Sequence, residues 1–158
     1  EKTNNIIEKL FHAMDITIDG VEVKTDDELG ISFFTVRAPD AKALIGTNGV
    51  VLRSLNYVVK KILEQELSQE TQQEEPVKLP SFFVDVDNYY TRRIDMLKTK
   101  ARIVADRARS FKRSIDLEPM FPYERLIIHS YLATLNDIET ESSGVGRDRH
   151  VVVKYIGT

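Results

Sequence analysis

The sequence feature that most constrains the fold is a regular apolar repeat between Arg92 and Phe111. Its apolar residues recur at spacings of three and four, which is the period of one face of an α-helix. The seam consists of Ile94, Leu97, Ala101, Val104, Ala108 and Phe111. Nine Lys and Arg residues lie between Arg92 and Ser114, opposed only by Asp95 and Asp106. We therefore predict a long basic helix, whose cations either bind nucleic acid or form a solvated face behind a packed seam.

Charge is divided unevenly along the 158 residues. Residues 1–88 hold 9 Lys and Arg against 16 Asp and Glu, whereas residues 89–158 hold 13 against 9. The net charge of −3 thus conceals a basic second half. This asymmetry predicts two units with different electrostatic tasks.

Several classes of protein are disfavoured by composition. The chain has no cysteine, so disulfides and thiolate metal sites are excluded. No window approaches the roughly 18 apolar residues of a membrane span, and we expect no membrane insertion. The histidines are not spaced as a metal or catalytic set, so we expect no cofactor, no metal and no enzyme. Asp85 and Asp87 resemble a carboxylate pair, but their alternation predicts that they share the solvent side opposite Val84 and Val86.

The pattern predicts an α+β fold with the order α-β-β-α-α-β, then the basic helix, then β-α-β-β. Asn5 and Glu8, in capping-box spacing, predict a helix at about 5–14. "ITIDGVEVK" and "ISFFTVR" read as a hairpin, and "FFVDVD" as a strand. Between them lie a short helix, a glycine-bounded break, a longer helix and the acidic "SQETQQEEP", read as a frayed helix end and a loop. After the basic helix come a strand in "IDLEP", a helix over "PYERLIIHSYLATL", and strands "IETESS" and "HVVVKYI" joined by "GVGRDR".

The break "LIGTNGVVLRSL" places Gly46 and Gly49 around Thr47 and Asn48, just before a helix. Glycines allow close approach of a phosphate to the main chain, and a helix N-terminus attracts anions. Within α-β-β-α-α-β, this motif resembles the G-x-x-G loop of a type II KH domain, which grips single-stranded nucleic acid. KH loops commonly carry a Lys or Arg between the glycines; here Arg53, one turn into the helix, is the candidate substitute.

Arg125 and His129 lie four residues apart, so one helical face presents a guanidinium beside an imidazole. Both fall just past the edge of the helix's apolar arc, a position that suits a phosphate clamp. Arg147 and Arg149 would add cations to the same rim if the last hairpin folds beside the helix. "LEPMFPYERLIIHSYL" followed by "ETESSGVGRDRHVVV" resembles the R-3-H domain, named for an Arg and a His separated by three residues. The resemblance implies that Arg125 and His129 face single-stranded nucleic acid.

These resemblances predict a KH domain at 3–88, a basic helix at 89–114 that begins the second domain, and an R-3-H domain at 115–158. Their combination resembles the Jag (SpoIIIJ-associated) family. It implies a cytoplasmic RNA-binding regulator tied to cell-envelope growth and division, with a small single-KH partner protein or a second copy of itself. The family usually carries a further N-terminal domain, so we expect a fragment of a longer protein.

Two alternatives stay open. The acidic first half and its loop without Lys or Arg favour a protein-interaction scaffold that uses the KH half for pairing. A single-stranded DNA binder is the other, because phosphate contacts and stacking do not distinguish the sugars.

Overall fold

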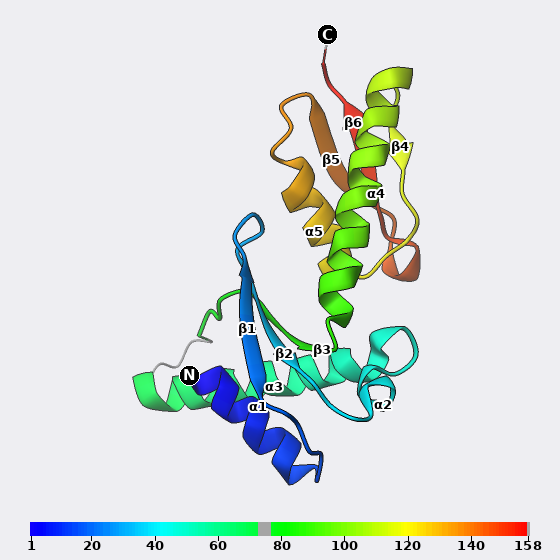
Figure 1. Ribbon diagram of the computed structural model, residues 1–158. Coiled ribbons are helices and arrows are strands. Elements are labelled where there is room, and N and C mark those ends of the chain that lie inside the picture. The colour runs from blue at the N-terminus through cyan, green and yellow to red at the C-terminus, as the bar shows by residue number, and fades with distance from the viewer. Residues whose placement is uncertain (73–76, 158) are drawn as a thin grey trace. The chain divides into compact units, whose positions relative to one another are not determined.

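The computed structural model describes residues 1–72 and 77–157. The chain divides into two compact units, residues 1–91 and 92–158 (Figure 1). Part of the predicted acidic loop, residues 73–76, lies outside the described residues. The domain limits predicted from the sequence, 3–88, 89–114 and 115–158, stay predictions.

The first unit has the predicted order α-β-β-α-α-β. Its elements are α1 (Lys2–Ala13), β1 (Val21–Asp26), β2 (Ile31–Val36), α2 (Ala41–Ile45), α3 (Val50–Thr71) and β3 (Phe82–Val86). The sheet order is β1-β2-β3, with β1 and β2 antiparallel as the hairpin prediction requires and β3 parallel to β2. Parallel pairing needs a long crossover, and the segment with α2 and α3 supplies it.

The capping box predicted at Asn5 is wrong. Helix α1 already begins at Lys2, after Glu1 as N-cap. The backbone N–H of Asn5 donates to the carbonyl of Glu1 at 3.1 Å, so Asn5 lies inside the first turn and not before it. The face of α1 that enters the core consists of Ile6, Ile7 and Phe11, which are all buried.

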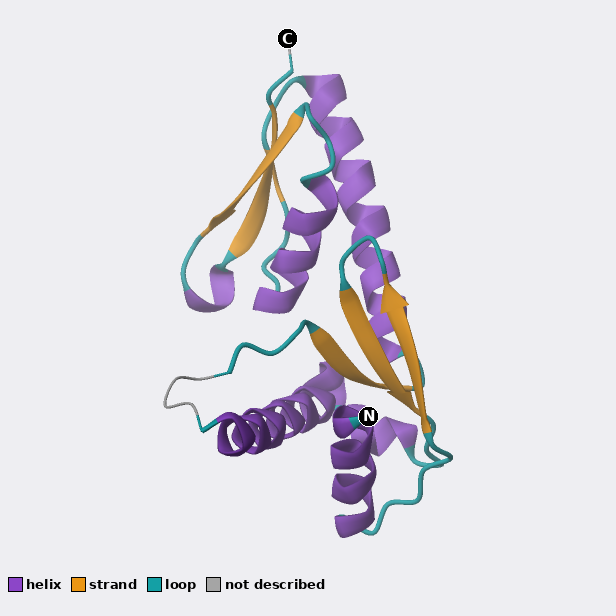
Figure 2. Cartoon of the chain, turned by 90° about the vertical axis from the view of Figure 1, so that its left-hand side faces the viewer, coloured by secondary structure: helices purple, strands orange, loops and turns teal. Residues whose placement is uncertain are grey.

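The core of the first unit lies where α1 and α3 pack together on one side of the sheet (Figure 2). Helix α3 contributes the buried side chains Leu52, Leu55, Val59 and Leu63 to this core, while Ile62 is half-buried. The buried polar residue Asn56 joins α3 to β3: its side chain donates to the carbonyl of Val84 at 2.8 Å and accepts from its N–H at 2.8 Å. These bonds satisfy backbone groups of β3, which stands at the end of the strand order β1-β2-β3.

The interpretation of Asp85 as solvent-facing is wrong. The side chain is 0% exposed, and its carboxylate accepts hydrogen bonds from the N–H groups of Val86 (2.9 Å), Tyr90 (2.8 Å) and Thr91 (3.1 Å). The hydroxyl of Thr91 donates to it as well, at 3.1 Å. Strand alternation gives the face of a side chain, but it does not tell whether that face is covered. Asp85 therefore anchors the start of the long helix, and burial raises the pKa of its carboxyl.

The second unit contains α4 (Tyr89–Phe111), whose first three residues belong to the first unit, followed by β4 (Ile115–Asp116), α5 (Pro122–Leu132), β5 (Ile138–Ser143) and β6 (His150–Tyr155). The order β-α-β-β after the long helix is the one predicted. The antiparallel sheet has the order β4-β6-β5, with the two helices on one side of it (Figure 2).

The predicted seam of α4 is buried along its length, except that Phe111, at the helix end, is 64% exposed. Helix α5 ends at Leu132, three residues before the predicted end at Leu135.

Candidate nucleic-acid interface

The G-x-x-G segment forms a tight turn between α2 and α3. Gly46, Asn48 and Gly49 all adopt positive φ angles, of 71°, 51° and 73°. Thr47 and Asn48 are exposed at the tip, whereas Gly49 is buried. A Cβ atom on Gly49 would lie 2.8 Å from Cε1 of Tyr89, so both backbone conformation and packing require glycine there. The turn presents exposed main chain at the N-terminus of α3, as the phosphate-binding hypothesis requires.

Gly49→Ala should destabilise the first unit more than Gly30→Ala does. Both glycines have positive φ, 73° and 66°, so both substitutions cost about 1–2 kcal/mol of backbone strain. Alanine at position 49 also clashes with the Tyr89 ring, whereas nothing lies within 4 Å of a Cβ atom at Gly30. The free energies of unfolding from urea denaturation measure the difference. Equal losses would contradict the close packing at Gly49.

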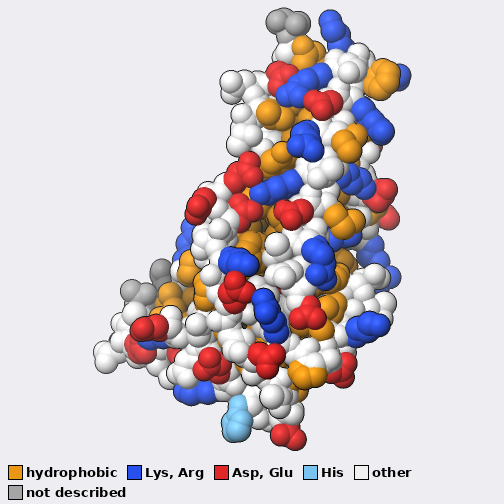
Figure 3. Space-filling view, viewed as in Figure 1, with side chains coloured by type: hydrophobic (Ala, Val, Ile, Leu, Met, Phe, Trp, Pro, Cys, Tyr) orange, Lys and Arg blue, Asp and Glu red, His pale blue; other side chains and the backbone are white. Residues whose placement is uncertain are grey.

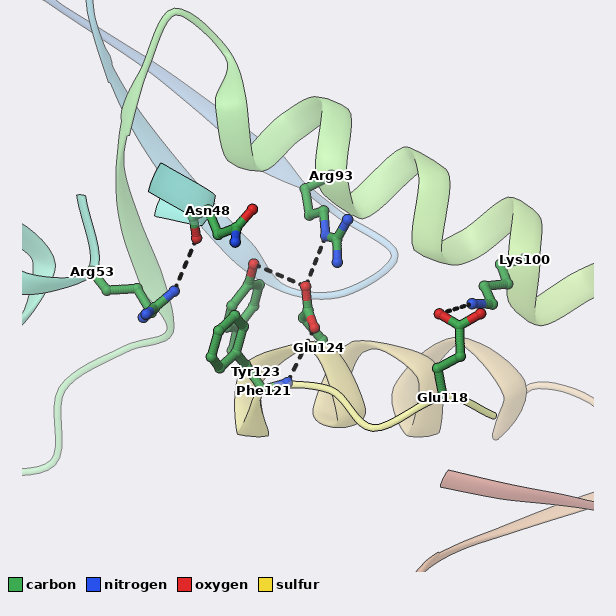
Figure 4. Close-up of polar contacts among 8 residues, drawn as sticks. All are labelled: Asn48, Arg53, Arg93, Lys100, Glu118, Phe121, Tyr123 and Glu124. Carbon is green, nitrogen blue, oxygen red and sulfur yellow. Dashed lines mark hydrogen bonds and ion pairs between the residues drawn. The ribbon is translucent and has the colours of Figure 1, made fainter. Parts of the chain in front are cut away.

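Arg53 supplies a cation at this turn. Its Nη1 donates to the carbonyl oxygen of Asn48 at 3.0 Å (Figure 4). The guanidinium therefore lies against the loop even though neither residue between the two glycines is basic. The structure thus brings Gly46, Thr47, Asn48, Gly49 and Arg53 together in one turn.

Arg125 and His129 occupy the same face of α5, and both are half-buried. The guanidinium of Arg125 donates through Nη1 to the carbonyl of Met120 at 2.7 Å. The ring of His129 bonds two hydroxyls of β5, Nδ1 to Thr140 Oγ1 at 2.6 Å and Nε2 to Ser142 Oγ at 2.8 Å. Both side chains are therefore held in place by neighbouring elements, and Arg125 forms no internal ion pair among the described residues.

The hairpin between β5 and β6 brings a second cation to this face. Arg149 is half-buried, and its Nη1 donates to the carbonyl of Gly144 at 2.9 Å. Arg147 lies exposed on the short 3-10 turn Gly146–Asp148 of the same hairpin. We call Arg125, His129 and Arg149 the Arg-His cluster.

The charge of this cluster comes from its two arginines. Burial, then the positive charges of Arg125 and Arg149, lower the pKa of His129 from its ordinary value of 6.5. The imidazole is therefore neutral at pH 7. It acts as one donor and one acceptor toward its two hydroxyl partners, so the positive charge of the cluster lies on the guanidinium groups.

The lowered pKa of His129 predicts an acid-sensitive contribution to stability. The unfolded chain takes up this proton at a higher pH than the folded chain does. The contribution is therefore complete above the unfolded pKa of about 6.5, and it is lost as the pH falls through the folded pKa. We expect the free energy of unfolding to fall more steeply between about pH 7 and pH 5 for the parent than for His129→Gln. Identical pH profiles in urea denaturation would contradict this.

The cations of α4 are partly engaged within the second unit. Arg109 forms a bidentate pair with Asp137, at 2.6 and 2.8 Å, and Lys100 pairs with Glu118 at 3.1 Å. The ammonium of Lys98 lies 5.9 Å from the ring centre of Tyr131. Figure 3 shows blue basic side chains over this helix interspersed with red acidic ones. The packed seam is thus established, while the role of the exposed cations in binding nucleic acid stays a prediction.

Beside α4 lies a groove of about 740 Å³, lined by parts of α4, the segment before α5 and Glu124. Across the described ranges, 1–72 and 77–157, no three His, Asp or Glu side chains gather as a metal ion would require. Within the same ranges no helix is both long and apolar enough to cross a bilayer.

Sequence patterns did not predict three residues of this site: Glu124, Thr140 and Ser142. Glu124 is 2% exposed and pairs with Arg93 at 2.8 Å (Figure 4). The sequence did contain a signal for Glu124, because a Glu three residues after a helix N-cap occupies a capping position. Thr140 and Ser142 gave a weaker signal, two hydroxyls of alternate strand residues on one face.

Comparisons with known proteins bear on both units. The family model of the R-3-H domain matches residues 95–155. A protein named RNA-binding protein KhpB from Clostridium symbiosum is 35% identical over 155 residues, which are 97% of this chain and 64% of that protein. KhpB of Bacillus subtilis (strain 168) is 32% identical over 124 residues, 77% of this chain and 55% of that protein. The chain therefore spans less than two thirds of the length of these relatives.

Fold, site and comparisons together define a class of protein in which an R-3-H domain follows a unit with the element order of a type II KH domain. The R-3-H match contains the Arg-His cluster and Arg147. The similarity to the Clostridium relative extends over nearly the whole chain, including the first unit. The chain thus contains an R-3-H domain and is similar, over nearly its whole length, to proteins named RNA-binding protein KhpB.

Proposed function

We propose that this chain binds single-stranded RNA and holds its phosphate backbone with the Arg-His cluster. The observation that carries the proposal is the convergence of two guanidinium groups, from α5 and from the β5–β6 hairpin, around the ring of His129. Guanidinium forks match the geometry of phosphate oxygens. The name of the relatives, RNA-binding protein KhpB, supports RNA as the ligand.

The G-x-x-G turn is the second proposed contact with the backbone of the strand. Its exposed tip, Thr47 and Asn48, leaves main chain accessible at the N-terminus of α3, and Arg53 adds positive charge to the turn. Phosphates bind such sites through backbone N–H groups and the helix dipole. Arg147, exposed on the hairpin, is proposed as a further cation for the strand.

The proposed biological role is post-transcriptional regulation linked to cell-envelope growth and division, in the cytoplasm. It rests on the similarity to the KhpB proteins and on the resemblance to the Jag family. We place no catalytic step in this function. A small single-KH protein and a second copy of the chain are the proposed protein partners.

Titration of fluorescently labelled single-stranded RNA in a series of salt concentrations tests the proposal. A strand held by several phosphate contacts is released as salt rises, with a slope that counts the contacts. Competition with DNA of the same sequence separates RNA binding from single-stranded DNA binding. Absence of binding at low salt would refute the proposal.

A second candidate function, protein pairing through the first unit, is favoured by one specific observation. Helix α3 exposes four large apolar side chains at helical spacing: Val50, Val51, Tyr57 and Val58. Exposed apolar stripes of this kind mark interaction surfaces. Sedimentation analysis discriminates the two functions: a scaffold self-associates without RNA and shows no salt-dependent affinity for it.

A further inference from the structure

Two aromatic rings stand at the N-terminus of α5, immediately before the Arg-His cluster. The rings of Phe121 and Tyr123 are nearly parallel, with centres 6.4 Å apart and an interplanar angle of 10° (Figure 4). This is an offset-stacked pair within the usual range of ring separations. Phe121 nevertheless remains 39% exposed, whereas a ring that served only the core would be covered.

The buried carboxylate of Glu124 fixes both aromatic residues. Its Oε2 accepts the backbone N–H of Phe121 at 3.1 Å, and its Oε1 accepts the hydroxyl of Tyr123 at 3.4 Å. Arg93 of α4 donates to the same Oε1 at 2.8 Å, which balances the buried charge. A buried, paired carboxylate of this kind orders the groups that it holds, which here are the backbone of Phe121 and the hydroxyl of Tyr123. The ring of Phe121 then packs against the ring of Tyr123 that is held in this way.

The rings and the phosphate-binding cation share one helical turn. The N–H of Arg125 donates to the carbonyl of Phe121 at 3.1 Å, and its guanidinium is bonded to the carbonyl of Met120. A strand whose phosphate lies at Arg125 therefore has an aromatic face within the reach of an adjoining nucleotide. Alternation of cations with exposed rings is how proteins hold single strands, because every base has a face that stacks.

We propose that the Phe121–Tyr123 pair is a base-stacking platform, which takes one unpaired nucleobase of the strand held at the Arg-His cluster, with Phe121 as the contacting residue. This inference rests on the proposed function, and it adds a contact with the base to contacts that involve only the backbone. Stacking tolerates any base, so the platform raises the affinity for RNA without making binding specific for a nucleotide sequence.

The test compares Phe121→Leu and Phe121→Trp in the full chain, with an RNA oligomer and with the same oligomer lacking its bases. Leucine keeps apolar volume but has no aromatic face. Loss of one stacked base should weaken binding of the intact oligomer about fivefold to a hundredfold. Tryptophan should bind at least as tightly as the parent. The salt slope should not change, because no cation is removed.

The oligomer without bases is the decisive control. The parent and Phe121→Leu should bind this oligomer with equal affinity, since only contacts with its backbone remain. If Phe121→Leu binds intact RNA as tightly as the parent, or weakens both oligomers by the same factor, the platform is refuted while RNA binding stands. If the parent binds neither oligomer, the proposed function itself has failed. Thermal unfolding of each variant establishes that the fold is retained.

Discussion

Arg125→Ala lowers the affinity of the chain for single-stranded RNA by roughly tenfold to a hundredfold. This is the expected result because a hydrogen bond to a charged group contributes about 1.5–3 kcal/mol. The guanidinium is already positioned by the carbonyl of Met120, 2.7 Å away, so little conformational freedom is lost when a phosphate binds. The slope of log affinity against log salt should also fall by about one. Fluorescence anisotropy across a salt series measures both quantities.

Two variants control this experiment. Arg125→Lys keeps the charge but loses the planar fork, so we expect an intermediate affinity and an unchanged salt slope. Arg37→Ala removes one cation of the first unit that lies just after β2 and pairs with Glu22 at 3.8 Å. This variant should leave the affinity nearly unchanged. If Arg125→Ala binds as the parent does, or if Arg37→Ala weakens binding equally, the Arg-His cluster is not the phosphate site.

Asp85→Ala lowers the free energy of unfolding by about 3 kcal/mol or more. The substitution leaves the N–H groups of Val86, Tyr90 and Thr91 without their carboxylate partner. Each unsatisfied buried donor costs about 1–3 kcal/mol, and loss of a helix cap costs about 0.5–2 kcal/mol. Because these donors include the first turn of α4, the start of the long helix should fray. Urea denaturation followed by circular dichroism measures the loss.

The matched controls separate the hydrogen bonds from the charge. Asp85→Asn keeps one oxygen that accepts hydrogen bonds, so it should lose less stability than alanine. Asp95→Ala changes an exposed aspartate of the same helix, where surface substitutions cost at most about 0.5 kcal/mol. A loss for Asp85→Ala no larger than that for Asp95→Ala would show that the carboxylate does not hold the helix start.

Periodicity was sufficient to predict the elements. The three-and-four spacing from Ile94 to Ala108 identified a helix whose seam is buried, and the hairpin patterns identified both antiparallel pairs. The ends of the helices were less predictable: Asn5 is of a residue type that often caps helices, but it lies within α1. Spacing also placed Arg125 and His129 on one face, because residues four apart on a helix are neighbours.

The hydrogen-bond partners of these side chains could not be predicted from the spacing of residues in the sequence. The sequence predicts that His129 faces nucleic acid, but it does not predict that both ring nitrogens bond hydroxyls of β5. The distance along the chain between His129 and Ser142 carries no signal that predicts the pairing. The hairpin was expected to add cations to this face if it folded beside α5. In the structure Arg149 lies close enough to His129 for its charge to lower the pKa of the ring.

The sequence by itself determined the order of helices and strands, the buried seam of the long helix and the helical face that Arg125 and His129 share. These are local properties, since they follow from the repeat of apolar side chains and from the conformations that each residue allows. Only the tertiary structure decided that Asp85 is buried, that Glu124 bonds the Phe121 backbone, the Tyr123 hydroxyl and Arg93, and that Arg149 lies near His129. Burial and pairing depend on what covers a side chain, and the covering groups come from segments distant in the chain.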